Sequence, residues 1–256
     1  MLHLRPHAKV NLGLFIQGKR ADGYHLLETL LYPVRDHCDD LWLEPRQDDR
    51  CVLTIEGLAL DSTPADNLCV RAWEALRRAL PDLPGVTLHL RKQIPAGAGL
   101  GGGSSDAAFT LRGLNQLYAL GLDTAQLAHI ATPLGADVPF FLYDQPLLAR
   151  GIGTDFEPLD LDLPYTLRVF PQPIHSSTVA AYRALDYRQC PVGRDLRAVL
   201  AQPVATWRTD LVNDLEGPVF AMYPALATAK AALYEQGAIY AAMSGSGSAL
   251  LGLFAD

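Results

Sequence analysis

The feature that most constrains this chain is a glycine-rich segment that joins a predicted strand to a predicted helix. Residues 95–105 read PAGAGLGGGSS, with five glycines among the nine residues 95–103. Alternating apolar residues precede it at 86–90, and helically spaced apolar residues follow at 106–120. Glycine permits positive φ and close approach to a ligand, and the free N–H groups at a helix start favour an anion. We therefore expect a phosphate-binding loop, the alternative being a tight turn or a flexible linker.

Other phosphate motifs fit the segment less well. Gly97, Gly99 and Gly102 satisfy G-x-G-x-x-G, but a dinucleotide fingerprint belongs to an opening βαβ unit with an acidic residue after the next strand. No Gly-Lys-Ser or Gly-Lys-Thr closes the loop, so the Walker pattern fails. Ser104 and Ser105 lie outside any G-x-S-x-G hydrolase elbow and are candidates for binding phosphate or a magnesium ion.

Composition and charge exclude several classes of protein. The chain has 256 residues, 49% of them hydrophobic, and 21 Lys and Arg against 28 Asp and Glu give a net charge of −7. No basic cluster is longer than Arg77-Arg78, which argues against a nucleic-acid partner. No stretch reaches about 18 apolar residues, and no signal-peptide core is present, so we expect a cytoplasmic protein without a membrane partner. The four cysteines are widely spaced, with no C-x-x-C and no His at zinc-finger distance, and this predicts buried thiols and no protein-bound metal: Cys38, Cys51, Cys69 and Cys190.

Apolar periodicity predicts a mixed α+β chain. Strands are expected at 10–16, 29–34, 41–44 and 52–55 as a β-meander, followed by a helix at 66–80 with Asp66 or Asn67 as its N-cap. After the strand at 86–90 and the loop, helices are expected at 106–120 and 124–133. Later strands are predicted at 138–143, 147–149, 166–170, 239–242 and 249–254, and later helices at 177–185, 195–201 and 218–236. Clustered Gly and Pro at 150–165 predict two lobes, at 1–155 and 156–256.

The loop also carries a family resemblance. PAGAGLGGGSSDAA at residues 95–108 resembles the ATP loop of the GHMP kinases, P-x-G-x-G-L-G-x-S-S-A. Three more segments are similar to family members that act on diphosphocytidyl-methylerythritol in non-mevalonate isoprenoid synthesis: AKVNLGLFIQGKRADGYHLLETL at 8–30, LGADVPFFL at 134–142 and SGSGSA at 244–249. The resemblance implies a two-lobed GHMP kinase fold, with an N-terminal ATP-binding lobe and a C-terminal acceptor-side lobe. It also implies phosphorylation of the acceptor 2-hydroxyl by ATP, which carries Mg²⁺.

The resemblance assigns a catalytic pair, Lys9 and Asp137. A carboxylate within hydrogen-bond reach can accept the proton that the acceptor hydroxyl loses, and an ammonium can orient that carboxylate and stabilise developing negative charge. Asp137 would thus be the base and Lys9 its partner. Taken alone, Lys9 would be an exposed lysine at a strand start, and Asp137 a loop cap before Pro139.

The resemblance also assigns binding residues. Asn11, Tyr24 and His25 would lie along the acceptor, with Tyr24 stacked on the cytosine and His25 bonded to its edge. Asn67 and Lys92 would lie near adenine or ribose, although a helix-cap role for Asn67 stays open. The ATP loop would comprise Pro95, Ala96, Gly97, Ala98, Gly99, Leu100, Gly101, Gly102, Gly103, Ser104 and Ser105. The second Gly/Ser turn, at 244–248, would line the floor of the active site beside the phosphates.

Alternatives remain at this point. A kinase of the same fold could act on mevalonate, homoserine or a sugar, although Asp22-Gly23-Tyr24-His25 favours the cytidyl acceptor. A non-catalytic relative that binds a nucleotide has no need of both Lys9 and Asp137, and an NAD-binding oxidoreductase would require a Rossmann order of elements. Two departures concern the C-terminal lobe: the chain stops at Asp256, before the helix that usually follows, and residues 170–177 match the family's acceptor loop loosely. A monomer or a weak homodimer is expected.

Overall fold

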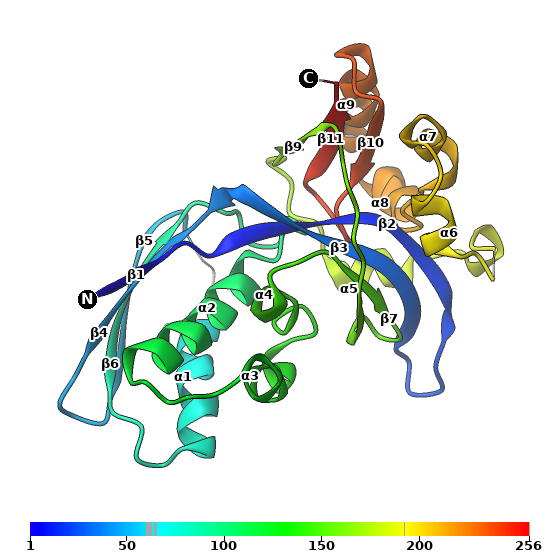
Figure 1. Ribbon diagram of the computed structural model, residues 1–256. Helices are drawn as coiled ribbons and strands as arrows, with labels where there is room; N and C mark the ends of the chain where they lie inside the picture. Colours follow the sequence, from blue (N-terminus) through cyan, green and yellow to red (C-terminus); the bar gives the residue numbers. More distant parts are fainter. Residues whose placement is uncertain (60–62, 64–65, 192, 256) are drawn as a thin grey trace. The chain divides into compact units, whose positions relative to one another are not determined.

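The computed structural model describes residues 1–59, 63, 66–191 and 193–255, which form two compact units. Unit 1 holds residues 1–9, 33–96 and 101–145, and unit 2 holds residues 10–32, 97–100 and 146–256. Each unit is assembled from separate chain segments, which the colours of Figure 1 follow. The predicted lobes at 1–155 and 156–256 follow chain order, and their boundary stays a prediction.

Unit 1 is built on a four-stranded sheet with the order β1-β4-β6-β5. Its strands are β1 (Leu2–Leu4), β4 (Asp40–Pro45), β5 (Cys51–Gly57) and β6 (Val86–Lys92). β5 is parallel to β6, whereas β4 is antiparallel to both β1 and β6. The predicted meander is therefore wrong, because β6 lies between β4 and β5. A parallel neighbour requires a crossover, and helix α1 (Leu68–Ala79) supplies it.

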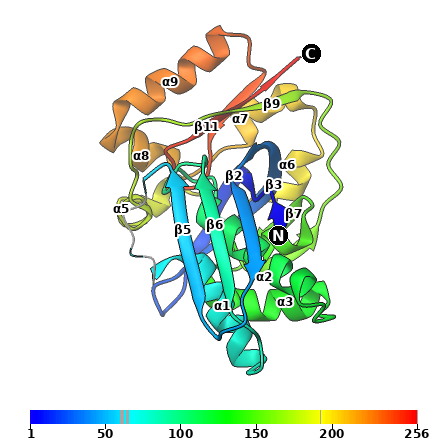
Figure 2. The ribbon, with the colours of Figure 1, turned by 90° about the vertical axis from the view of Figure 1, so that its left-hand side faces the viewer.

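Helices cover one face of this sheet, as Figure 2 shows for α1 and α2. The helices of unit 1 are α1, α2 (Gly102–Leu117), α3 (Thr124–Ala131), the 3₁₀ turn η2 (Thr132–Leu134) and the short α4 (Phe140–Tyr143). The strand predicted at 138–143 is wrong, since this segment forms a turn and α4. Phe140, Phe141 and Leu142 are buried there, and a short buried apolar run does not distinguish a strand from a helix.

Unit 2 contains two sheets. The first has the order β2-β3-β7-β8, from β2 (His7–Lys19), β3 (His25–Cys38), β7 (Leu147–Arg150) and β8 (Asp155–Pro158). The start of β2, residues 7–9, and the end of β3, residues 33–38, belong to unit 1. The second has the antiparallel order β10-β11-β9, from β9 (Thr166–Phe170), β10 (Tyr240–Met243) and β11 (Leu250–Phe254). The predicted strands at 10–16, 29–34, 147–149 and 166–170 lie within or match these elements, whereas β8 was not predicted.

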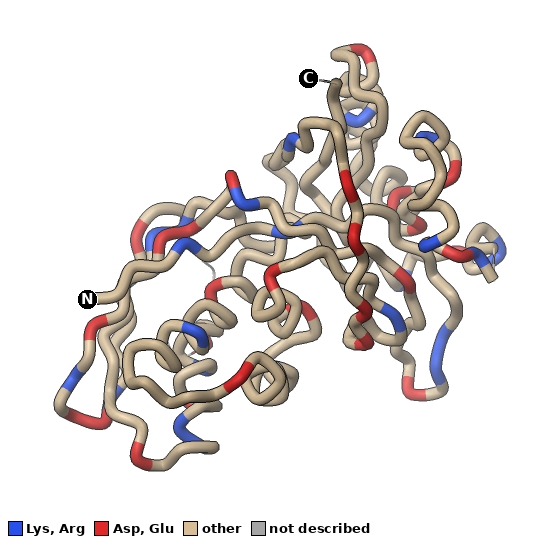
Figure 3. The backbone as a smooth tube through the Cα atoms, in the orientation of Figure 1, with Lys and Arg blue, Asp and Glu red and all other residues tan. Residues whose placement is uncertain are grey.

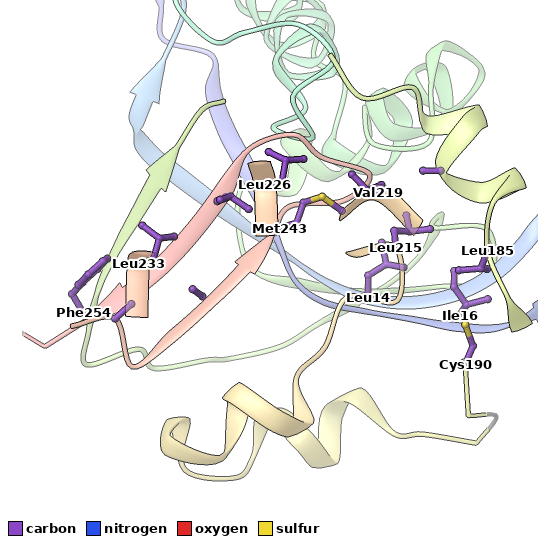
Figure 4. Packing of buried hydrophobic residues seen from close by; sticks show 14 residues of the cluster. Leu14, Ile16, Leu185, Cys190, Leu215, Val219, Leu226, Leu233, Met243 and Phe254 are labelled. Atoms are coloured by element: carbon purple, nitrogen blue, oxygen red, sulfur yellow. The ribbon is translucent and has the colours of Figure 1, made fainter. Parts of the chain in front are cut away.

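Helical segments of unit 2 pack around an apolar core. They are α5 (Thr178–Arg183), η3 (Tyr187–Gln189), α6 (Leu196–Leu200), η4 (Val204–Thr206), α7 (Trp207–Asp210), α8 (Glu216–Met222) and α9 (Pro224–Glu235). Figure 4 shows Leu14 of β2 among Leu215, Val219 and Met243 of this core. The single helix predicted at 218–236 is wrong, because the chain breaks between α8 and α9, where Pro224 offers no N–H donor and disfavours helical geometry in the preceding residue.

The described residues confirm the α+β class, with helices and strands mixed along the chain. Lys and Arg are interspersed with Asp and Glu along the backbone, and Figure 3 shows no long basic run. No helix in the described part of the chain has the length and apolar character needed to cross a bilayer.

Candidate active site

A buried lysine and a half-exposed aspartate form an ion pair in unit 1. Lys9 lies on β2, and its Nζ is 3.3 Å from Asp137 Oδ2. The side chain of Lys9 is 5% exposed, whereas that of Asp137 is 37% exposed. The structure therefore brings together the two residues that were predicted to be catalytic, and it leaves the carboxylate open to solvent.

Asp137 is held by a tight turn that leads into α4. The N–H of Val138 donates to the carbonyl oxygen of Gly135, and the N–H of Phe141 donates to that of Val138. Val138 and Phe141 are fully buried on either side of this turn. The polar Asp137 thus projects from a segment whose apolar side chains anchor it to the core of unit 1.

Gly101 packs directly against Lys9. Its φ is +70°, and a Cβ built on it would lie 3.0 Å from Lys9 Cγ and 2.9 Å from Phe141 Cζ. Glycine is required here both by the left-handed backbone and by the close approach of the lysine stem. The predicted catalytic lysine and the predicted ATP loop are therefore neighbours in unit 1.

The first turn of α2 presents backbone donors. Gly101 is its N-cap and supplies no side-chain cap, and the first helical hydrogen bond runs from the N–H of Ser105 to the oxygen of Gly101. The opening N–H groups of a helix lack intrahelical acceptors, and the helix dipole adds positive potential. Gly102, Gly103 and Ser104 occupy this position, which suits a phosphate group.

The earlier part of the loop is fixed to the Gly/Ser turn in unit 2. Ser244 Oγ donates to the carbonyl oxygen of Gly99 at 2.8 Å, and the N–H of Ala249 donates to that of Ala98 at 3.0 Å. A Cβ on Gly99, whose φ is +76°, would collide with the Ser244 carbonyl group. The N–H of Asn11 donates to Ser244 Oγ at 3.1 Å. Three predicted motifs thus meet at Ser244.

Lys92 is buried, with an exposure of 2%. Its Nζ donates to the carboxylates of Asp39 and Asp106, the second at 2.7 Å. Burial lowers the pKa of Lys92, but the charges of Asp106 and Asp39 outweigh it and raise that pKa above its usual value. Burial raises the pKa of Asp106 to about 7, despite the opposing charge of Lys92. The triad of Lys92, Asp39 and Asp106 thus joins the end of β6 to α2, beside the glycine-rich loop. A contact of Lys92 with ATP stays a prediction.

Asn67 is the N-cap of α1. Its Oδ1 accepts a hydrogen bond from the N–H of Cys69 at 2.9 Å, which confirms the predicted cap. A Cβ on Gly103 would lie 3.6 Å from Leu68 Cδ1, so the start of α1 adjoins the loop. The predicted contact of Asn67 with adenine or ribose stays a prediction.

Tyr24 and His25 line a cavity of about 430 Å³ in unit 2. Tyr24 is 61% exposed, whereas His25 packs on Tyr182 at a centroid distance of 4.5 Å and stacks on Tyr187 at 5.8 Å. Burial and the charge of Lys19 lower the pKa of His25, and its buried Nε2 has no hydrogen-bond partner among the described residues. The remaining wall is formed by Lys19, Gly23, Leu27, Ile152, Thr178, Val179, Tyr182 and Arg183. A flat ring with polar edges fits this cavity. The side chains of Lys19 and Arg183 in its wall favour an anion there.

Sequence reasoning missed several residues around this cavity and the loop. Thr178 and Tyr182 lie four residues apart on α5, a spacing that puts them on one helix face. The sequence shows this spacing, but it does not show that the shared helix face lines the cavity with Tyr24 and His25. His175 was also missed: a Cβ on Gly97 would lie 2.7 Å from His175 Cε1. Ser176 Oγ donates to the carbonyl oxygen of Ser246 at 2.7 Å, so the loosely matching segment is fixed to the Gly/Ser turn.

Two family models match the chain. "GHMP kinases N terminal domain" matches residues 67–145, and "GHMP kinases C terminal" matches residues 196–256. The fold and the phosphate loop are thus those of the GHMP kinase class, whose members use ATP as co-substrate.

Within residues 1–59, 63, 66–191 and 193–255, no group of three or more His, Cys, Asp or Glu could hold a metal ion.

Individual relatives identify the family within the GHMP kinase class. The chain is 45% identical to a 4-diphosphocytidyl-2-C-methyl-D-erythritol kinase of Porphyromonas gingivalis, over 98% of this chain and 91% of the relative. It is also 45% identical to the protein of that name from Prosthecochloris aestuarii, over 99% and 89%. A crystal structure of 4-(cytidine 5'-diphospho)-2C-methyl-D-erythritol kinase matches with a TM-score of 0.86 and 36% identity, over 98% of this chain and 90% of that one. The chain therefore belongs to the 4-diphosphocytidyl-2-C-methyl-D-erythritol kinase family.

A more distant structure shares the fold alone. A mevalonate kinase matches with a TM-score of 0.72 at 14% identity, over 99% of this chain and 91% of that one. Such a likeness carries no information about the acceptor. The choice of acceptor therefore depends on the closer relatives and on the residues of the site.

Proposed function

We propose that this protein is an ATP-dependent kinase that phosphorylates the 2-hydroxyl of 4-diphosphocytidyl-2-C-methyl-D-erythritol in non-mevalonate isoprenoid synthesis. The observation that carries the proposal is the Lys9–Asp137 pair, whose lysine packs on Gly101 of the phosphate loop. Relatives with 45% identity over nearly the whole chain bear the name of this activity.

The catalytic step follows from the two side chains. Asp137 accepts the proton of the acceptor hydroxyl while the hydroxyl oxygen bonds to the γ-phosphorus of ATP. The bond between that phosphorus and the β–γ bridging oxygen breaks, and ADP leaves with the electron pair. Lys9 orients the carboxylate and stabilises the negative charge that develops.

The acceptor is recognised through its base. Tyr24 stacks on the cytosine, Tyr182 offers a second ring in the same cavity, and His25 bonds to the edge of the base. Lys19 and Arg183 line the same wall and suit the diphosphate of the acceptor. Asn11 lies beside Ser244 and completes the predicted acceptor residues.

ATP is bound by the backbone of residues 95–105, with the donors of the first turn of α2 directed at its phosphates. Mg²⁺ would enter with the nucleotide and would neutralise phosphate charge. Ser104 is half-buried and offers a hydroxyl to the magnesium nucleotide, whereas Ser105 is fully buried.

We also propose that the enzyme works in the cytoplasm as a monomer or weak homodimer, without a nucleic-acid or membrane partner. The thiols of Cys38, Cys51, Cys69 and Cys190 are free, as a reducing compartment requires. Sedimentation velocity over a range of protein concentrations measures the oligomeric state.

A coupled ADP-release assay across several acceptors tests the proposed function. We expect turnover with the cytidyl conjugate and background release with mevalonate, homoserine, galactose and unconjugated methylerythritol. Equal turnover of another acceptor would show a different kinase of the same class. ATP binding without ADP release for any acceptor would show a non-catalytic relative.

A further inference from the structure

A histidine–aspartate contact also joins the two segments that carry Lys9 and Asp137. His7 precedes Lys9 by two residues on β2, so both side chains lie on the same face of the strand. His7 Nε2 lies 2.9 Å from Asp144 Oδ1. Asp144 is the C-cap of α4, the helix that follows the Asp137 turn. The segment 137–144 is therefore tied to β2 by the Lys9–Asp137 ion pair at one end and by the His7–Asp144 contact at the other.

Both ring nitrogens of His7 face hydrogen-bond acceptors. Nδ1 lies 2.8 Å from the carbonyl oxygen of Ala8, and Nε2 faces the Asp144 carboxylate. A carbonyl and a carboxylate only accept hydrogen bonds, so both contacts are satisfied when both ring nitrogens carry protons. The side chain of His7 is 4% exposed and that of Asp144 is 36% exposed, so the contact is shielded from solvent on the side of the imidazole.

Asp144 is also held by a cation. Arg35 Nη2 donates to the backbone oxygen of Asp144 at 2.7 Å and to its Oδ1 at 3.1 Å. The hydrogen bond from His7 is the largest influence that holds the pKa of Asp144 below its usual value. Asp144 has a φ of +53°, a left-handed conformation that costs a non-glycine residue energy, and these contacts stabilise it there.

The ring of His7 also packs against the apolar support of the catalytic pair. Its centroid lies 5.6 Å from that of Phe109 on α2, at an interplanar angle of 88°, and 5.5 Å from that of Phe141 on α4. Phe141 adjoins Gly101, which packs on Lys9. A shift of α4 would therefore be transmitted both to Asp137 and to the lysine stem.

We propose that His7 and Asp144, supported by Arg35, are positioning residues that set the distance between Lys9 and Asp137 by anchoring the 137–144 segment on β2. The proposal rests on the proposed function for the role of Asp137. A half-exposed carboxylate on a short turn can rotate away from its partner unless both ends of the turn are fixed. Misplacement by about 1 Å costs a catalytic step on the order of 100-fold.

The test replaces His7 by Gln, which keeps a hydrogen-bond donor but lacks the imidazole ring whose two nitrogens face the Ala8 carbonyl and the Asp144 carboxylate. We expect His7→Gln to lower kcat by about 10- to 100-fold while both KM values stay unchanged, because the binding residues are untouched. Asp144→Asn should have the same effect, Asp144→Glu should retain more activity, and the double variant should be no worse than either single one. Wild-type kcat in His7→Gln, or a loss confined to KM, would overturn the proposal.

The chain offers a matched control. His3 and Asp40 form another His–Asp pair at 2.9 Å in the same unit, between β1 and β4, with the His3 side chain 44% exposed. His3→Gln should leave kcat unchanged. If His7→Gln failed to fold, Arg35→Gln would decide the proposal, since Arg35 is 61% exposed and its removal weakens Asp144 without opening the core. We expect Arg35→Gln to lower kcat less than His7→Gln does. An unchanged kcat in Arg35→Gln would contradict the proposed anchoring of Asp144.

Amide hydrogen exchange separates this proposal from the proposed function, because it needs no substrate. The N–H groups of Leu142 and Asp144 donate to the carbonyl oxygens of Pro139 and Phe140. Their exchange should be faster in His7→Gln and unchanged in His3→Gln. Unchanged exchange in His7→Gln would reject the anchoring, whereas an inactive wild-type enzyme would reject the proposed function alone.

Discussion

Lys9 Nζ lies 3.3 Å from Asp137 Oδ2, and the lysine side chain is 5% exposed while that of the aspartate is 37% exposed. The ammonium thus approaches the carboxylate from the protein interior. A base must reach a proton on a substrate that arrives from solvent, whereas its cationic partner need not. The difference in exposure therefore favours Asp137 as the base and Lys9 as the group that orients it.

Gly101→Ala should weaken ATP binding and slow turnover. The left-handed backbone alone costs alanine about 1–2 kcal/mol. The new methyl group would also press on Phe141 and on the stem of Lys9. Isothermal titration with ATP and steady-state kinetics measure the two effects.

Gly121→Ala is the control for Gly101. Gly121 has a φ of +72°, but a Cβ built on it would have no atom within 4 Å, so this variant carries the backbone strain without the collision. It should lose stability but keep ATP affinity. If both variants bound ATP as the wild type does, the close packing at Gly101 would not be needed for ATP binding.

Tyr24→Ala should weaken the cytidyl acceptor and leave the KM for ATP unchanged. One lost aromatic stack on a base is worth ~1–3 kcal/mol, or about 5- to 150-fold in affinity. Tyr24→Phe keeps the ring and should keep the affinity. Equal increases in both KM values would remove Tyr24 from the acceptor side.

The buried Asp106 makes stability depend on pH. Its pKa rises from 3.8 in the unfolded chain to about 7 in the fold, so the folded state binds the proton more tightly. Its contribution to stability is fully present below 3.8 and is lost as the pH rises through about 7. The free energy of unfolding of the wild type, relative to Asp106→Asn, should therefore fall between these values, by at most ~1.4 kcal/mol per pH unit.

Chemical denaturation of both proteins across this pH range measures the difference. The amide introduced by Asp106→Asn retains the shape of the side chain but cannot ionise. A difference that instead grew as the pH rose would mean that the pairing with Lys92 outweighs burial. The sign of the slope thus decides which influence dominates in the triad.

Local patterns in the sequence were enough to predict much of the fold. Alternation identified β2 and β6, helical spacing identified α1 and α2, and the glycine density identified the loop. The helix α4 was missed because its buried apolar run has no period of its own. The break before Pro224 was visible in the sequence but was overridden by the surrounding helical pattern.

The site was predictable where a motif carried it and not where it depends on tertiary contacts. Lys9 and Asp137 lie in matched motifs, and the structure brings them together. Tyr182 and His7 carry no motif, since their roles depend on which surface the fold places opposite them. Lys92 sits in a matched position, yet the burial of its ammonium between two carboxylates follows from the packing of α2 on the sheet.

The most direct test of this account is the turnover of Asp137→Asn with the cytidyl acceptor, measured beside its affinity for ATP. The amide keeps the shape of the side chain but cannot accept the proton, so kcat should fall by ~10²–10⁴-fold with ATP binding near normal. Asp36→Asn, at an exposed carboxylate of the same unit, controls for loss of surface charge and should turn over as the wild type does. A kcat for Asp137→Asn above about a tenth of the wild-type value would contradict the assignment. The loss would then be smaller than the smallest contribution expected of a positioned base.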